Sequence, residues 1–373
     1  MKFVVDKKKL LQALELATRF VSRNTTLPIL ENVAVIGKID TLELRATDMN
    51  KFISITFPAQ IESEWAITVN AKMLFDAIRI SDWDEILMEG KDDGTLLTVI
   101  SDKDKFEFKC ISINEYVAIP DIENEDVLSI DAEILWKWIE RVESSIPDKS
   151  FTTIITWMLV KSNWDYLAFV WTDSFRLAEY RLQENIGKNF ELVIPKYTLS
   201  EIKKVSDLAV ADKNSDVKVK FDNKMISFFY KIGDFDILIK TNLISGQYPD
   251  YERIILPEYN FKITVDKNLL DKAIRKVSLF SKDISYFVKF IPDEEKLIIS
   301  SGETDLWEGV TQIPAIFDGN AISLGLNWKS ILDFLKYVEW EEVLFQIFDE
   351  EKPVLLRDKV DKGYRFVIRP LKE

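Results

Sequence analysis

Histidine is absent from the 373 residues, and cysteine occurs only once. The lack of histidine removes the side chain that most often acts as a general base or a metal ligand near neutral pH. The single Cys110 cannot form an internal disulfide and suits a reducing compartment, which predicts a cytoplasmic protein. We interpret Cys110 as a small apolar strand residue rather than a reactive thiol.

Long apolar runs and the common enzyme motifs are also missing. No segment is apolar over the length that spans a bilayer, and Met1–Asp6 lacks a signal-peptide pattern, so we expect no membrane partner. There is no phosphate-binding glycine loop, no G-x-S-x-G and no paired cysteine motif. These absences predict no catalytic residues, no metal and no cofactor, because an enzyme would need a site built from carboxylates alone.

Negative charge dominates an otherwise ordinary globular composition, with a formal net charge of −14 and 47% hydrophobic residues. Taken as an average, this charge argues against nucleic acid as a partner. Screening confines the field of each charge to about 8 Å at physiological ionic strength, so a basic strip can coexist with an acidic exterior. The charge therefore weakens a DNA-binding function without excluding it.

One pattern occurs three times in a chain whose length suits two or three domains. Each copy is a short alternating strand, an Asp that can cap a helix, and apolar residues at helical spacing. The copies are Phe3–Leu14, Leu128–Ile139 and Ile263–Ile274. A second strand-to-helix pattern follows in each copy, at Ala66–Ile78, Leu192–Ile202 and Ile322–Leu335.

Short alternating segments predict half-buried strands around these helices: Leu42–Ala46, Lys105–Cys110, Val217–Phe221, Lys224–Tyr230 and Lys296–Ser300. The order predicts an α+β fold of three tandem copies of a two-helix, antiparallel-sheet domain. We place these domains at residues 1–125, 126–258 and 259–373. The segments Ile119–Asp126 and Leu256–Asn260, which contain proline and acidic residues, would be the linkers.

The stretch Trp171–Arg181 combines polar and apolar residues directly after Tyr166–Val170, an apolar run typical of a buried strand. Its Thr172-Asp173 is echoed by Thr47-Asp48, so we interpret this pair as part of the repeated architecture. The continuation Ser174–Leu177 belongs to the middle copy alone. We predict partner binding there.

With these repeats the chain resembles the beta subunit (sliding clamp) family of bacterial DNA polymerase III. The resemblance runs the whole length, on motifs in the same order and spacing: Thr26–Leu30, Ala46–Asp48, Thr172–Ala178, Val193–Lys196, Gly246–Arg253 and Phe366–Leu371. It implies a non-catalytic processivity factor for DNA replication, with two chains joined head to tail in a homodimeric ring. The implied partners are double-stranded DNA, bound without sequence preference, and the DNA polymerase III catalytic subunit, the clamp loader and other proteins with a clamp-binding motif.

The resemblance also implies three sets of site residues. DNA-facing residues on or near the repeated helices would be Arg23, Lys72, Arg79, Lys137, Lys196, Lys203 and Arg275. The dimer interface would contain Lys103, Lys105, Phe106, Phe108, Leu279, Phe280, Glu303 and Asp305. The partner-peptide pocket would contain Ile155, Thr172, Ser174, Phe175, Arg176, Leu177, Pro249, Arg253, Ile254, Val367, Arg369, Pro370 and Leu371. The family often ends in Met-Pro-Met-Arg-Leu, whereas this chain ends in Arg369–Glu373, which leaves its peptide preference open.

Two alternatives stay open at the level of sequence. One is a carboxylate-dependent metal nuclease with Asp48 and Asp173 as ligands, although a turn role explains both carboxylates better. The other is a repeat scaffold that does not bind DNA. Leu177 and Val367 could also be ordinary core residues.

Tryptophan is unusually frequent and glycine scarce, at 10 and 11 residues. Trp83 and Trp340 follow the second helix of their copies, where a left-handed backbone would favour glycine. Trp65, Trp157 and Trp307 stand where the family often has glycine. We hypothesise that UGA codons encode glycine at these positions, and UGG codons at Trp83 and Trp340 would refute this. A genome poor in glycine codons is the alternative.

Overall fold

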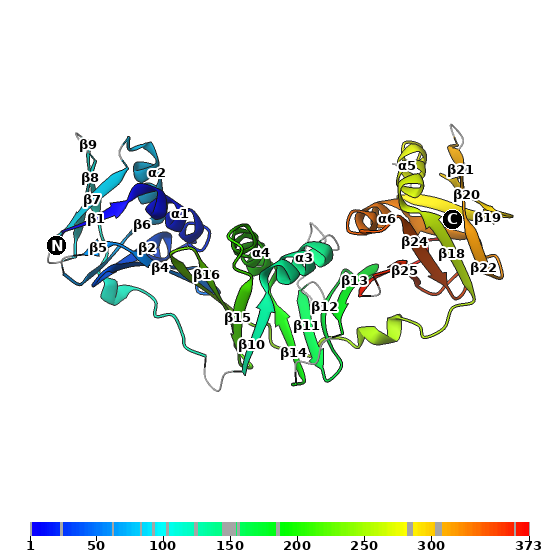
Figure 1. Ribbon diagram of the computed structural model, residues 1–373, viewed down its shortest axis with the longest axis horizontal. Coiled ribbons are helices and arrows are strands. Elements are labelled where there is room, and N and C mark those ends of the chain that lie inside the picture. The colour runs from blue at the N-terminus through cyan, green and yellow to red at the C-terminus, as the bar shows by residue number, and fades with distance from the viewer. Residues whose placement is uncertain are drawn as a thin grey trace. The chain divides into compact units, whose positions relative to one another are not determined.

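A computed structural model describes residues 2–22, 25–61, 63–82, 84–91, 94–101, 104–122, 126–143, 154, 157–183, 187–281, 286–302, 308–361 and 363–372 (Figure 1). The chain forms two compact units. The first unit contains Met1–Trp136 and Tyr197–Ile244, and the second contains Lys137–Lys196 and Ser245–Glu373. Helix α3 (Ala132–Glu143) begins in the first unit and continues into the second.

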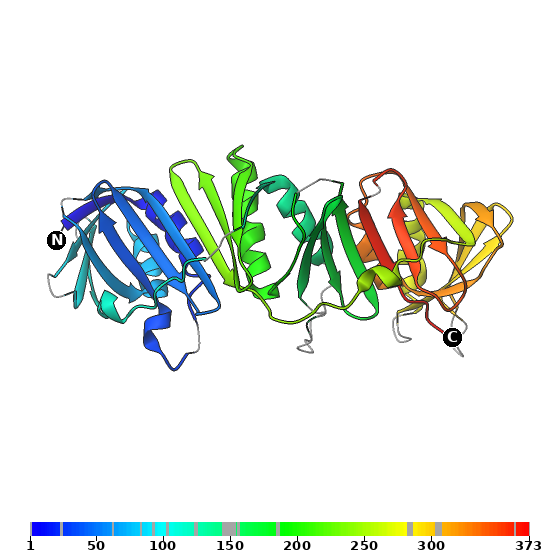
Figure 2. The same cartoon turned by 90° about the horizontal axis from the view of Figure 1, so that it is seen from below.

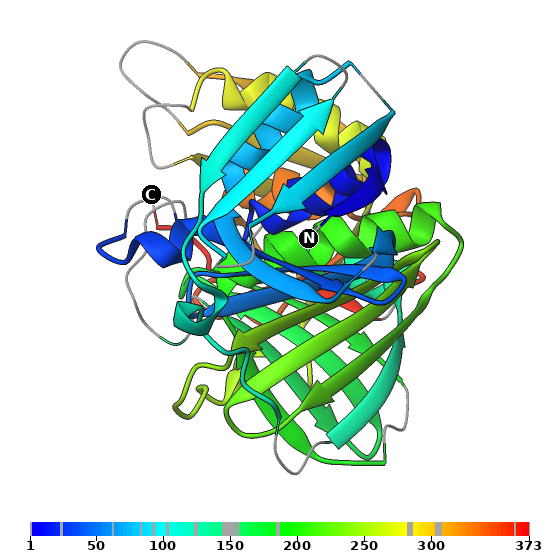
Figure 3. The ribbon, with the colours of Figure 1, turned by 90° about the vertical axis from the view of Figure 1, so that its left-hand side faces the viewer.

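The first unit contains two antiparallel sheets and the helices α1 (Lys7–Ala17), α2 (Ala71–Ile80) and α4 (Lys196–Ala211). The five-stranded sheet has the order β5-β1-β7-β8-β9 and lies over α1 and α2 in Figure 3. Its strands are β1 (Lys2–Asp6), β5 (Gln60–Ile61), β7 (Glu85–Gly90), β8 (Leu96–Ser101) and β9 (Asp104–Lys109).

The eight-stranded sheet of this unit has the order β10-β15-β16-β17-β4-β3-β2-β6. Its strands are β2 (Asn32–Lys38), β3 (Thr41–Thr47), β4 (Lys51–Pro58), β6 (Trp65–Asn70), β10 (Asp126–Asp131), β15 (Asp216–Phe221), β16 (Met225–Ile232) and β17 (Phe235–Asn242). Two 3₁₀ turns, η1 (Pro28–Glu31) and η2 (Ile113–Glu115), complete the unit. Leu10 and Leu14 of α1 and Ile202 of α4 are fully buried, so each helix turns its apolar stripe toward the strands.

The second unit contains a nine-stranded sheet of order β14-β11-β12-β13-β26-β25-β24-β18-β22 and a four-stranded sheet of order β21-β20-β19-β23. The larger sheet, whose red and green strands lie side by side in Figure 2, contains β11 (Met158–Asn163), β12 (Tyr166–Thr172), β13 (Arg176–Leu182), β14 (Phe190–Ile194), β18 (Phe261–Asp266), β22 (Ile316–Gly319), β24 (Glu342–Ile347), β25 (Val354–Asp358) and β26 (Tyr364–Ile368). The smaller contains β19 (Phe287–Asp293), β20 (Lys296–Ser300), β21 (Val310–Pro314) and β23 (Leu324–Asn327). Helices α5 (Lys267–Ser278) and α6 (Trp328–Leu335) and the 3₁₀ turn η4 (Tyr251–Ile254) belong to this unit.

Alternation along β13 separates the two faces of the nine-stranded sheet. Ala178 is paired with Phe366 of β26, whose ring lies 5.7 Å from that of Phe334 in α6. That face is the helix face, and Trp138 of α3 packs on it against Phe169, with ring centroids 4.0 Å apart. The opposite face carries Thr172, Leu177, Val367 and Leu355, and we call it the Leu177 face.

The three repeats are confirmed at their helix caps. Asp6, Asp131 and Asp266 each accept a hydrogen bond from an amide of the following first turn, from Lys9 at 2.8 Å, Glu133 at 2.8 Å and Leu269 at 2.8 Å. These bonds satisfy amides that have no partner inside the helix. Asn70 and Asn327 cap the second helices of the first and third copies in the same way. The predicted α+β class is therefore confirmed.

One turn is also repeated three times. Thr47, Thr172 and Ser300 accept, through the side-chain hydroxyl, the amide of the residue two positions on, at 2.9, 3.2 and 3.2 Å. That residue has a left-handed backbone in every copy, with φ of 76° at Met49, 75° at Ser174 and 78° at Gly302. Thr172-Asp173 thus belongs to the shared architecture, as the sequence predicted, and the third copy keeps the turn with different side chains.

The structure corrects one premise of the tryptophan hypothesis, the left-handed backbone expected at Trp340. Helix α6 ends at Leu335 and its cap, Lys336, is right-handed, so Trp340 lies well past the helix end. Trp340 is also not among the described residues with positive φ, and the prediction of a left-handed C′ position there is wrong. Trp83 and Trp307 lie outside the described residues.

The other tryptophans have different environments. Trp157 is half-buried. Trp65 is 6% exposed, and its ring fills the space over Gly37, where a Cβ would lie 2.4 Å from the indole nitrogen. Glycine at position 65 would leave this space empty. Trp171 is fully buried.

A buried carboxylate in the first unit makes stability depend on pH. Burial would raise the pKa of Glu43, but hydrogen bonds from Arg45, Ser54 and Lys38 outweigh burial and lower the pKa from 4.5 to about 2. The resulting stabilisation is present above pH 4.5 and is lost as the pH falls from 4.5 toward 2. It amounts to up to about 3 kcal/mol, reduced by solvent screening of the partly exposed cations.

We therefore expect the difference in unfolding free energy between the wild type and Glu43→Gln to shrink below pH 4.5. Urea titrations of both proteins at pH 7, 4.5 and 3 measure this difference. Glu64→Gln, which changes an exposed carboxylate of the same unit, is the control. A difference that stays constant with pH would contradict the prediction.

Candidate functional site

The β12–β13 turn presents the predicted partner-binding residues in a fixed conformation. The carboxylate of Asp173 accepts the amides of Phe175 at 3.0 Å and Arg176 at 2.9 Å, and the hydroxyl of Thr172 donates to the carbonyl of Arg176 at 2.7 Å. Ser174 is exposed at the left-handed position. Phe175 follows it with 70% of its surface exposed. The turn therefore holds an aromatic ring in solvent.

Pairing of β13 with β26 brings the end of the chain to this turn. Leu177 is paired with Val367, and the amide of Arg369 donates to the carbonyl of Phe175 at 3.0 Å. The amide of Leu371 donates to the carbonyl of Gly325 at 2.8 Å. Leu177 and Val367 are 1% and 3% exposed, so both belong to the sheet's apolar layer in the free chain. Arg369 is exposed, and Pro370 and Leu371 are half-buried.

Arg176 points away from Leu177. Its guanidinium lies on the helix face, 3.0 Å from Asp173 and 2.8 Å from Asp333 of α6. The two carboxylates hold a side chain that is only 14% exposed. Arg176 thus anchors the turn to α6, while Leu177 lies on the opposite face.

The segment from Ser245 to Asn260 crosses the Leu177 face, and its 3₁₀ turn is visible over the strands in Figure 2. Tyr251 donates to Glu179 of β13 at 2.9 Å, and Tyr166 of β12 donates to Glu252 at 2.5 Å. These bonds bring Pro249, Arg253 and Ile254 to the same face, with Ile254 41% exposed. The side chain of Arg253 is 85% exposed and bonds Asp250 at 2.7 Å. Ile155, also predicted here, lies outside the described residues.

Two of the predicted DNA-facing residues meet in the first unit. Lys72 and Arg79 of α2 line a hollow of about 510 Å³ together with Arg19, which follows α1. Arg79 bonds Asp76 at 2.9 Å. Arg19, which sequence reasoning missed, pairs with Glu201 of α4.

The remaining predicted cations lie on separate helices. Lys196 is exposed at the start of α4, while Lys203 and, on α3, Lys137 are half-buried. Arg275 of α5 is held by two bonds to Asp271, at 2.7 and 3.0 Å, and these bonds raise its pKa. Arg23 lies outside the described residues.

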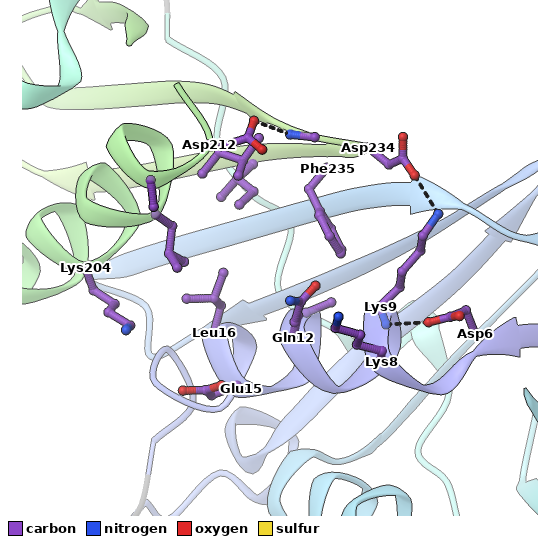
Figure 4. Close-up of a pocket in the computed structure, with 16 residues that line it drawn as sticks. Asp6, Lys8, Lys9, Gln12, Glu15, Leu16, Lys204, Asp212, Asp234 and Phe235 are labelled. Atoms are coloured by element: carbon purple, nitrogen blue, oxygen red, sulfur yellow. Dashed lines mark hydrogen bonds and ion pairs between the residues drawn. The ribbon is translucent and has the colours of Figure 1, made fainter. Parts of the chain in front are cut away.

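A second hollow, of about 610 Å³, lies between α1 and α4 (Figure 4). Leu16 and Phe235 are among its apolar lining residues, and Lys8 and Lys204 contribute charge. Lys9 bonds Asp234 at 2.5 Å across its edge. Sequence reasoning missed these lysines, although the run Lys7-Lys8-Lys9 at the start of a helix was a visible signal.

The predicted interface residues that the structure describes lie on or near the outermost strands of two sheets. β9 is the outermost strand of the five-stranded sheet and β21 the outermost strand of the four-stranded sheet. Phe106 and Phe108 of β9 are half-buried, and the exposed Lys105 bonds Glu107 at 2.8 Å. Leu279 and Phe280, just after α5, are 66% and 40% exposed. Lys103, Glu303 and Asp305 lie outside the described residues.

Metal and thiol chemistry find no support in the described part of the chain. No group of three or more Cys, Asp or Glu residues there is arranged to hold a metal ion. Asp48, like Asp173, accepts amides of its own turn, from Asn50 and Lys51 at 2.9 Å each. Burial raises the pKa of Cys110 to about 11, which leaves an unreactive thiol. No described helix is both long and apolar enough to cross a membrane.

Comparison with known proteins gives one consistent result. Residues 1–120, 129–250 and 252–372 match the models of the N-terminal, central and C-terminal domains of the DNA polymerase III beta subunit. A beta sliding clamp of Staphylococcus aureus is 23% identical over 387 residues, covering 100% of this chain and 99% of that protein. The beta sliding clamp of Synechococcus elongatus is 24% identical over 379 residues, with the same coverage.

Solved structures show the same fold. A DNA polymerase sliding clamp from Bacillus subtilis superposes with a TM-score of 0.91 at 23% identity, covering 100% of this chain and 99% of that one. A DNA polymerase III beta subunit from Pseudomonas aeruginosa gives a TM-score of 0.91 at 21% identity, covering 100% of both chains.

Proposed function

The chain belongs to the DNA polymerase III beta subunit family, and we propose on this premise that two copies close head to tail into a sliding clamp around duplex DNA. The clamp is a processivity factor without a catalytic site or cofactor of its own. The observation that carries the proposal is the repeat: three copies of one capped strand–helix unit in the order of the family's N-terminal, central and C-terminal domains.

Three domains follow from this repeat, at residues 1–125, 126–258 and 259–373. The three matched segments support this division: the first boundary, 125/126, lies between matched residues 120 and 129, and the second, 258/259, lies seven to eight residues after matched residues 250 and 252. Their six copies in a dimer would form the ring. Because β9 and β21 each leave one edge unpaired, pairing of one chain's β9 with the other's β21 would continue the sheets across the junction.

Duplex DNA would run past the helices. Lys72, Arg79 and the lysines of the hollow between α1 and α4 supply positive charge on helices of the first unit, and Lys196 supplies it at the start of α4. Contacts of this kind reach phosphates and carry no sequence information, so the ring would slide. The acidic exterior then accounts for the net charge of −14.

The Leu177 face would bind the replicative polymerase, the clamp loader and other partners through a short peptide. Exposed Phe175 and Ile254 and half-buried Leu371 offer apolar contacts around the buried Leu177 and Val367. Exposed Arg253 and Arg369 offer charge at the rim. An apolar centre with a polar rim is the usual anatomy of such a site. A protein with these partners would work in the cytoplasm.

Retention on circular DNA tests the function. Loaded by its clamp loader onto nicked circular duplex, the protein should stay bound through gel filtration and should dissociate within minutes once the circle is linearised. An enclosing ring can leave only past an end, whereas a surface-bound protein is indifferent to linearisation. The control is the same reaction without the clamp loader. Equal loss from circles and from linear DNA would reject a ring and favour a scaffold.

A further inference from the structure

Leu177, Val367 and Leu355 form an apolar row on the Leu177 face. A second, basic row lies beside it. Arg357 of β25 is paired with Arg365 of β26, and Arg365 is paired with Glu179 of β13. Each of the three stands two residues along its strand from a member of the apolar row. The basic row is therefore on the same face, about 7 Å away.

This row holds more guanidinium groups than carboxylates. The carboxylate of Glu179 is fully buried, bonds Arg181 at 2.8 Å and is ion-paired with Arg365. No carboxylate in the described part of the chain pairs with Arg357. The Nε atoms of Arg357 and Arg365 are both buried without an acceptor. Burial and the neighbouring charge of Arg365 lower the pKa of Arg357, and they outweigh the opposite effects of Tyr259 and Glu179.

Two guanidinium groups side by side in a partly buried place are unfavourable unless an anion joins them. Their unsatisfied N–H groups lose hydrogen bonds to water without replacement, and their like charges repel. A carboxylate corrects both, because guanidinium and carboxylate form short charge-assisted hydrogen bonds. Arg357 as a whole residue is half-buried, so part of its surface stays accessible to a ligand although its Nε is buried.

We propose that Arg357 and Arg365 form a carboxylate subsite of the partner-peptide pocket. It binds an acidic side chain, or the terminal carboxylate, of a peptide whose apolar anchor lies on the apolar row of the Leu177 face. This inference rests on the proposed peptide-binding function. The spacing of about 7 Å corresponds to two residues of extended peptide, so the carboxylate belongs two positions from the anchor.

Three fluorescent peptides with one Leu-Phe anchor test the subsite by anisotropy against the full chain. The first has Glu two positions from the anchor and an amidated end, the second has Gln there and an amidated end, and the third has Gln and a free carboxylate end. They are titrated against the wild type, Arg357→Gln and Lys296→Gln. Lys296 is an exposed cation in the same unit and is the matched control for lost charge.

We expect the wild type to bind one of the two carboxylate peptides about tenfold more tightly than the neutral peptide. The peptide preferred tells whether the carboxylate is a side chain or a chain end. Arg357→Gln should reduce this preference to within about twofold while keeping the affinity for the neutral peptide, and Lys296→Gln should keep both. The thermal midpoint of Arg357→Gln should equal or exceed that of the wild type, because this substitution removes an uncompensated charge.

Two results would overturn the subsite and leave the peptide pocket standing: equal affinity of the wild type for all three peptides, or a clear fall in the thermal midpoint of Arg357→Gln, which would make Arg357 a structural residue. Failure of the wild type to bind any of the three peptides would instead reject the pocket itself, and the subsite with it.

Discussion

Leu279→Asp combined with Phe280→Asp should convert the proposed dimer to a monomer without unfolding the chain. Both side chains are exposed in the single chain, at 66% and 40%, so the substitutions disturb little of the core. In a ring the two side chains would be buried at the junction. Losing each apolar contact costs about 1.5–3 kcal/mol, which weakens each junction by about 10²–10⁴-fold.

Sedimentation velocity across a concentration series measures this effect, and circular dichroism confirms that the fold is kept. Ile39→Asp is the matched control, because Ile39 is 71% exposed at the β2–β3 turn of the other unit and has no place in the proposed junction. The double variant should also lose retention on circular DNA in proportion to its dissociation. A variant that remains dimeric at wild-type concentrations would place the junction elsewhere.

Local features of the fold were predictable because their causes are local. Asp6, Asp131 and Asp266 cap their helices through amides three residues or fewer away, and each is followed by apolar residues at helical spacing. The Thr172-Asp173 turn is equally local, and the same Thr-Asp dipeptide recurs in the sequence at Thr47-Asp48. Neither feature depends on the partner strand.

The candidate site was harder to predict because its contacts are distant in sequence. Arg176 and Leu177 were assigned to one pocket by resemblance, yet the pleat sends adjacent residues to opposite faces. Of the two carboxylates that hold Arg176, one belongs to Asp333, 157 residues away. The meeting of Arg357 with Arg365 likewise requires the register of β25 and β26, which no periodicity in the sequence specifies.

Glu179→Ala should be the most destabilising single substitution on the Leu177 face. Glu179 is 0% exposed and accepts hydrogen bonds from Tyr251 at 2.9 Å and Arg181 at 2.8 Å while also pairing with Arg365. Truncation would remove the carboxylate shared by two half-buried cations, Arg365 and Arg181, and would leave Arg181 only Glu252, at 3.6 Å. Removing one partner of a buried pair typically costs about 3–5 kcal/mol, because the remaining charge stays desolvated.

Hydrogen exchange followed by mass spectrometry measures this cost where it arises. Peptides from β13 and β26 should lose protection by about two to four orders of magnitude in Glu179→Ala, while β3 and β4 of the other unit serve as an internal reference. Glu191→Ala is the matched control. Its carboxylate is 49% exposed and pairs with Lys161 at 3.2 Å, so its loss should cost less than about 1 kcal/mol.

A compensating pair of substitutions separates charge from packing. If uncompensated charge causes the loss, Glu179→Leu together with Arg365→Met should recover much of it, since apolar residues of similar volume often replace a buried ion pair at little cost. The recovery stays incomplete because the hydroxyl of Tyr251 would still lack its acceptor and Arg181 would keep only Glu252, at 3.6 Å. A double variant as unstable as Glu179→Ala would show that side-chain shape, rather than charge, holds the Ser245–Asn260 segment on the sheet. The opposite responses expected of Glu179 and Arg357 then have one electrostatic origin: in the described part of the chain, Glu179 pairs directly with Arg365 and Arg181, whereas no carboxylate pairs directly with Arg357.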